Sequence, residues 1–72
     1  MALHEHRRKL GRTIRRYREQ AGLTQERLAE KADLTAKYVG EVERGLVNIS
    51  VDSLFRLAKA LKVRVNDLTR EI

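Results

Sequence analysis

The side chains that could do chemistry in this 72-residue chain are mostly cationic, and the usual catalytic and metal-binding types are scarce. Cysteine is absent, so there is no thiolate nucleophile, no thiolate metal ligand and no disulfide. The two histidines, His4 and His6, are spaced i, i+2, which puts them on different faces of a helix. We therefore expect a solvated N-terminus there rather than a metal site. With so few candidate groups in so short a chain, we expect no enzyme, no cofactor and no small-molecule ligand.

The positive charge is concentrated at the N-terminal end. The net charge is +6, and the first 18 residues carry seven basic residues against one acidic residue, whereas the other 54 carry nine of each. Such a cluster attracts polyanions and raises association rates, although a solvated helix face can carry the same charges. Arg12, Arg15 and Arg16 can either reach a phosphate or supply only a diffuse field. We take Arg16 as a candidate phosphate contact.

No apolar run approaches the roughly 20 residues that a membrane-spanning helix needs, and no apolar stretch of a secretory signal follows the charged N-terminus. We therefore expect a soluble, cytoplasmic protein without a membrane partner. A domain of this size hides only about 60% of its unfolded surface, so a partner subunit would add useful burial.

Helical periodicity accounts for the whole chain, and no stretch alternates polar and apolar residues for long. We expect one all-α domain over residues 1–72, with hydroxyl side chains starting helices and glycines ending them. Gly11, inside the first helix, is placed for close packing. The expected helices cover about residues 5–21, a segment after the cap Thr24, residues 36–44 after the cap Thr35, a segment after the cap Ser50 and a short segment from about Asn66, with Gly22 and Gly45 as terminators.

Apolar residues recur on one face of each of these helices. The residues expected to face inward are Leu10, Ile14, Tyr17 and Ala21 in the first helix, Leu28, Ala29 and Ala32 in the second, Val39 and Val42 in the third, and Val51, Leu54, Leu57, Ala58 and Leu61 in the fourth.

Residues 24–44 have the spacing of a helix-turn-helix motif. If Gln25 is its first position, the fifth position must be small because the two helices cross there, and it is Ala29. The ninth position needs a residue that tolerates positive φ, usually glycine; here it is Asp33, which visits that region more readily than most residues do. The spacing favours a two-helix DNA reader over a generic helical hairpin. The positions that must be apolar, the fourth, eighth, tenth, fifteenth and eighteenth, are Leu28, Ala32, Leu34, Val39 and Val42.

The residues of the third helix that the core does not use are candidates for reading base edges in the major groove. Lys37 can donate to guanine O6 or N7, and Thr35 can bond a base or a phosphate. The Ala36 methyl can touch a thymine methyl. Glu41 can accept from cytosine N4 or repel the backbone and so select against wrong sites.

Three segments together resemble a known family: Gly22-Leu-Thr-Gln25-Glu-Arg-Leu28-Ala29, Tyr38-Val-Gly-Glu-Val-Glu-Arg-Gly45 and Leu57-Ala-Lys-Ala-Leu61. Over Arg18 to Val65 the chain resembles the lambda-repressor-like (XRE) helix-turn-helix regulators. The short length, Tyr38 and the Asn48-Ile-Ser50 segment also resemble the controller proteins of restriction–modification systems, although phage repressors and antitoxins share much of this pattern.

The resemblance implies a compact five-helix domain of a prokaryotic or phage type, which docks its third helix in the major groove of double-stranded DNA, usually as a homodimer. It implies phosphate contacts from Gln25, which also braces the recognition helix, and from Tyr38, Arg44 and Asn48; Tyr38 can instead be half-buried. It further implies a paired arginine and glutamate, Arg18 and Glu43, that links the first and third helices.

We expect a sequence-specific, autoregulatory transcription regulator that reads a pseudo-palindromic operator. An antitoxin-like interaction module with secondary DNA binding is the alternative, and a basic helix lying on a membrane is weaker because the core needs its apolar stripe. The candidates for the dimer surface are the apolar residues outside the core stripe: Leu46, Val47, Phe55, Leu68 and Ile72.

Overall fold

The computed structural model describes residues 2–70 and 72, and this part of the chain forms five helices and no strand. None of the described helices is both long enough and apolar enough to cross a membrane. The helices are α1 (Ala2–Gln20), α2 (Gln25–Ala32), α3 (Ala36–Glu43), α4 (Val51–Leu61) and α5 (Val65–Thr69).

The predicted helix boundaries are set by local hydrogen bonds. Each of the three predicted caps, Thr24, Thr35 and Ser50, accepts a bond at its side-chain oxygen from the backbone N–H three residues later. Both predicted terminators have a φ of 72°, in the left-handed region where glycine is unstrained. Asp33 has a φ of 58° and ends α2, as its place in the motif predicts. Lys62 ends α4 in the same left-handed conformation, and this helix end was not predicted from the sequence.

The core lies where α1, α2, α3, α4 and α5 meet, and most of the predicted inward-facing residues belong to it. Three predictions about apolar residues are wrong. Ala21 lies beyond the last residue of α1 and is exposed, because the chain has already turned towards α2. Val51 is 68% exposed, because α4 packs through its second and third turns. Leu68 is fully buried in the core of this chain and is therefore not available to a dimer surface. The buried core consists of Leu10, Ile14, Leu28, Ala29, Ala32, Val39, Val42, Leu57, Ala58, Leu61 and Leu68.

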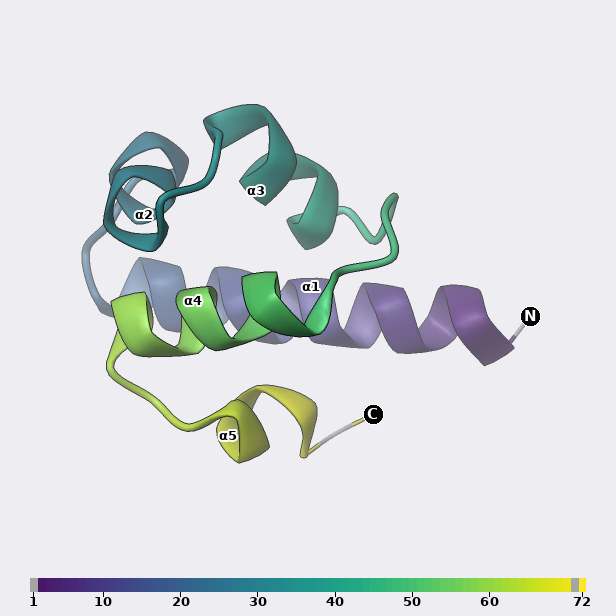
Figure 1. Ribbon diagram of the computed structural model, residues 1–72. Coiled ribbons are helices and arrows are strands. Elements are labelled where there is room, and N and C mark those ends of the chain that lie inside the picture. Colours follow the sequence, from purple (N-terminus) through teal and green to yellow (C-terminus); the bar gives the residue numbers. More distant parts are fainter. Residues whose placement is uncertain (1, 71) are drawn as a thin grey trace.

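Figure 1 shows α2 and α3 packed together on one side of α1 and α4, with α5 on the opposite side. The contact between α1 and α3 is unusually close at Gly11. A Cβ built on Gly11 would lie 2.4 Å from the carbonyl oxygen of Val42 and 2.6 Å from that of Glu43. The last turn of α3 therefore rests directly on the backbone of α1, as the close packing predicted for Gly11 requires. This arrangement fixes α3 from beneath and leaves its other face open.

Candidate nucleic-acid interface

The outer face of α3 carries the predicted base-reading residues. Lys37 and Thr35 are exposed, whereas Ala36 and Glu41 are half-buried. The Thr35 hydroxyl oxygen accepts the backbone N–H of Tyr38 at 3.1 Å, so its own hydrogen is not used by the cap. The structure thus brings a cation, a hydroxyl, a methyl and a carboxylate together on the first turns of one helix.

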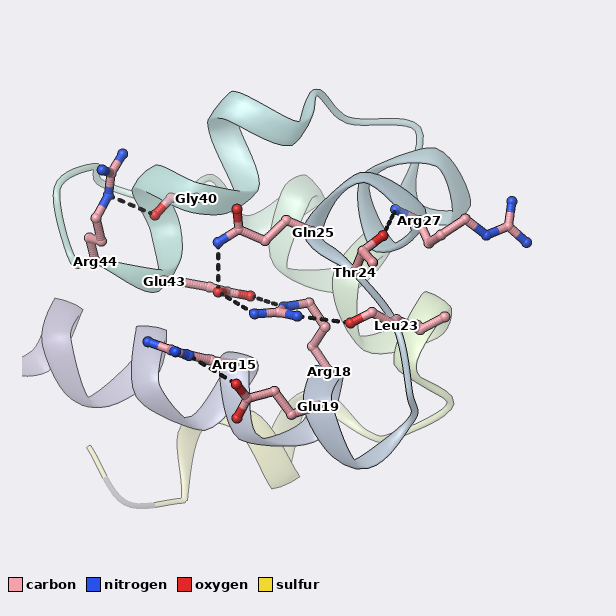
Figure 2. A network of polar contacts seen from close by, with 10 residues as sticks. All are labelled: Arg15, Arg18, Glu19, Leu23, Thr24, Gln25, Arg27, Gly40, Glu43 and Arg44. Carbon is pink, nitrogen blue, oxygen red and sulfur yellow. Dashed lines mark hydrogen bonds and ion pairs between the residues drawn. The ribbon is translucent and has the colours of Figure 1, made fainter.

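The inner face of α3 is held by a buried ion pair (Figure 2). Arg18 on α1 donates from Nε to Glu43 Oε2 at 2.6 Å and from Nη2 to Oε1 at 3.1 Å. Its Nη1 donates to the carbonyl oxygen of Leu23 at 2.8 Å. The side chains are only 12% and 3% exposed, so one guanidinium ties α3 both to α1 and to the start of α2. The inner face of α3 is therefore packed against the rest of the domain and cannot contact a nucleic acid.

The charge of Glu43 also stabilises the charged form of Arg18 in this ion pair. The hydrogen bonds and the charge of Glu43 raise the pKa of Arg18 above its ordinary value, against the opposing effect of burial. Folding therefore stabilises the charged form, and that contribution is lost only as the pH rises through the raised pKa. Arg18 stays charged over the whole physiological range, so the pair acts as a permanent link and not as a pH switch.

Gln25 links the buried Arg18–Glu43 ion pair to the start of α2 at the surface. Its side-chain nitrogen donates to Glu43 Oε1 at 3.0 Å, and its side-chain oxygen lies 3.5 Å from the position of a Cβ built on Gly40. Gln25 is also the first residue of α2, where free backbone N–H groups and the helix dipole favour an anion. The side chain is half-buried between the recognition helix and this helix end.

The other predicted phosphate contacts lie on two sides of α3. Arg44 is exposed, and its Nε donates to the carbonyl oxygen of Gly40 at 3.2 Å, on the side of Gln25. Tyr38 is half-buried, and it lines an open surface hollow with Thr35 and the exposed Asn48. The exposed part of α3 is therefore flanked by polar groups on both sides.

Arg16 does not join this arrangement. Its guanidinium lies over the Tyr17 ring, 5.5 Å from the ring centroid, and the side chain shares a shallow groove with Lys9, Arg12 and Thr13. Arg16 and Lys9 are five and two residues from Gly11, and helical spacing therefore places them on a different edge of α1 from the contact with α3. Besides Arg18, a second basic residue of α1 approaches the end of α3: Arg8, which packs on Gly45. Sequence reasoning missed Arg8, although its spacing of i, i+3 from Gly11 and i, i+10 from Arg18 could have found it.

The apolar candidates for a dimer surface are mostly exposed. Leu46 is 62%, Phe55 is 59% and Ile72 is 44% exposed, whereas Val47 is half-buried. Val51, which the periodicity had placed in the core, lies one turn before Phe55 on the same face of α4. Among the described residues, no group of three or more metal-ligating side chains lies together.

The model of the family described as "Helix-turn-helix" matches residues 14–68. The chain therefore belongs to the helix-turn-helix family. No curated protein sequence matches it significantly.

Solved structures agree with this assignment. The restriction–modification controller protein C.AhdI from Aeromonas hydrophila is 40% identical, with a TM-score of 0.85 over 86% of this chain and 94% of that one. The clp gene regulator ClgR from Corynebacterium glutamicum is 34% identical, with a TM-score of 0.86 over 90% of this chain and 69% of that one. The restriction–modification controller protein C.Esp1396I is 29% identical, with a TM-score of 0.81 over 90% and 87%. The all-α, lambda-repressor-like fold expected from the sequence is thereby confirmed.

Proposed function

We propose that this protein is a cytoplasmic transcription regulator that binds a twofold-symmetric DNA operator as a homodimer, with α3 in the major groove. One observation carries the proposal. The inner face of α3 is held to α1 and α2 by Glu43, whereas its outer face presents polar side chains with further polar groups on both sides. A rigid helix with an open polar face is what direct readout of base edges requires.

The base contacts follow from the chemistry of the outer face. Lys37 donates to guanine O6 or N7, and the free hydroxyl hydrogen of Thr35 donates to a base or a phosphate. The Ala36 methyl packs on a thymine methyl. Glu41 accepts from the amino group of cytosine, or rejects sites that bring a phosphate close to it.

The phosphate contacts divide between the two walls of the groove. On one side, Gln25 and the first turn of α2 meet the backbone together with Arg44. On the other side, the Tyr38 hydroxyl and the Asn48 amide meet the opposite strand. Phosphate contacts set the register of α3 without reading sequence, so this double flank supports specificity by fixing where Lys37 and Thr35 point.

The homodimer would place two copies of α3 about 34–36 Å apart, one helical turn of DNA. Val51 and Phe55 on α4 are our candidate centre of the dimer surface, because they form an exposed apolar pair one turn apart. Leu46, Val47 and Ile72 are candidates for its rim. By similarity to the two controller proteins, we further propose that the chain controls a restriction–modification operon that includes its own gene.

The test is a binding selection from random duplex DNA at about physiological salt, where non-specific binding is weak. We expect an enriched inverted repeat with half-sites about one helical turn apart. Sedimentation should show a dimer for the wild type and a monomer for Phe55→Asp, while Leu46→Asp reports whether the surface extends to the end of α3. Salt-sensitive binding to any DNA with no enriched sequence, together with a tight protein partner in a pull-down, would instead support the antitoxin-like module.

A further inference from the structure

The end of α3 is covered by a basic residue of α1. A Cβ built on Gly45 would lie 3.0 Å from both the backbone nitrogen and Cγ of Arg8. Gly45 directly follows Arg44, an exposed residue that we propose faces the DNA. Arg8 is itself exposed beyond this contact. Arg8 on α1 and Arg44 at the C-cap of α3 therefore begin close together, beside the C-terminal end of the proposed recognition helix.

A second arginine lies on the same edge of α1. Gly11 and Arg18 both contact Glu43, Gly11 through its backbone and Arg18 through its side chain. Arg15 lies one turn after Gly11 and one turn before Arg18, so helical spacing puts it on the edge of α1 that faces α3. Figure 2 shows Arg15 on the stretch of α1 that runs beneath Glu43. Its partner is Glu19 at 3.2 Å, and the two side chains are 62% and 56% exposed.

We propose that Arg8 and Arg15, the α1 clamp, bind backbone phosphates of the DNA beside the end of α3; the inference rests on the proposed DNA-binding function. The clamp continues the flank that Gln25 and Arg44 begin. An exposed i, i+4 pair such as Arg15–Glu19 is weak, so a phosphate replaces Glu19 without difficulty. The occupant is a polyanion, because the clamp adds two positive charges and no apolar area.

The clamp has a mechanical consequence. Gly11 abuts the backbone of α3 and Arg18 is bonded to Glu43, so α1 is firmly connected to the last turn of α3. A phosphate held by Arg8 or Arg15 therefore fixes the position of the C-terminal end of α3 relative to the DNA. Contacts at Thr35 and Lys37 fix the position of its N-terminal end. The clamp positions the recognition helix and reads no base itself.

The test compares two edges of the same helix. Arg8→Gln and Arg15→Gln remove a charge from the clamp, whereas Arg16→Gln and Lys9→Gln remove an identical charge from the opposite edge, where these residues share a groove. Glutamine keeps the backbone and Cγ atoms with which Arg8 touches Gly45. Affinity for the selected operator is measured between 50 and 200 mM salt, and thermal melts check that each variant folds.

Each clamp variant should reduce the slope of log affinity against log salt by about 0.9, so the affinity lost across this salt range shrinks about three- to fourfold. The two control variants should leave the slope close to that of the wild type, and Arg8→Lys should restore it. Equal slopes for all four glutamine variants would overturn the clamp and leave α1 with only a diffuse field. A lower melting temperature of Arg8→Gln with an unchanged slope would assign Arg8 to the α3 helix end instead. If the wild type selects no sequence at all, the proposed function fails and not merely the clamp.

Discussion

The two faces of α3 place opposite demands on their side chains. On the inner face, Glu43 is 3% exposed and its carboxylate accepts three hydrogen bonds, from residues of two other helices. On the outer face, Lys37 is exposed and makes no hydrogen bond or ion pair with any residue that the structure describes. The inner face thus determines where the helix lies, and the outer face carries the side chains that we propose contact DNA. On this helix of eight residues, we therefore expect different residues to determine stability and DNA specificity.

The largest effect should come from removing the inner carboxylate. Glu43→Ala leaves the Arg18 guanidinium buried without its partner, which costs about 3–5 kcal/mol of unfolding free energy. Glu41→Ala is the matched control, since it removes the same side chain from a half-buried site on the same helix and should change stability by about 0.5 kcal/mol or less. Urea unfolding monitored by circular dichroism measures both. Equal midpoints for the two variants would remove the distinction between the faces.

Gly11→Ala should be the next most damaging change. The added methyl group would meet two backbone carbonyl oxygens of α3 at 2.4 and 2.6 Å, and backbone cannot rotate away as a side chain can. Separating the helices costs about 1–3 kcal/mol, against a gain of at most about 1 kcal/mol from helix propensity. The tilt of α3 should change as well, so operator affinity falls even at temperatures where the variant is folded. A variant with wild-type stability and affinity would contradict the close contact.

Lys37→Ala should reverse this pattern. Nothing in the described structure depends on the Lys37 side chain, so the melting temperature should stay within error of the wild type. Operator affinity should fall by about 1–3 kcal/mol, and preference at a single base pair should be relaxed. Lys59→Ala removes the same charge from α4, outside the proposed recognition helix, and should weaken binding without changing which base is preferred. Parallel selections with both variants make the comparison, and relaxed preference in both would contradict readout by Lys37.

The features that were predictable from the sequence are those decided within a few residues. Caps such as Thr35, the left-handed Asp33 and the apolar spacing of the motif are local, and the structure has them where the pattern put them. The errors concern how one helix meets another. Leu68 lies in a helix of five residues, too short for periodicity to tell a buried side from an exposed one. Arg16 was chosen over Arg8 because each arginine of α1 was judged by its charge alone, and its position relative to Gly11, where α1 crosses α3, was not considered.

The effect of Gly40→Ala should be the smallest. It tests where the inner face of α3 ends, because Gly40 lies between the inner and the outer face. Gly40 is buried in the middle of α3, yet a Cβ built there would meet only the Gln25 side chain, at 3.5–3.8 Å, which is ordinary van der Waals contact. Gly40→Ala should therefore stabilise the domain by about 0.4–1 kcal/mol, since alanine is the better helix former. The Gln25 bond to Glu43 should survive, so the operator preference should not change. A destabilised variant would mean that the Gln25 side chain does not tolerate a methyl group even at an ordinary contact distance. The tightly packed inner contact would then extend one turn further along α3 than its hydrogen bonds indicate.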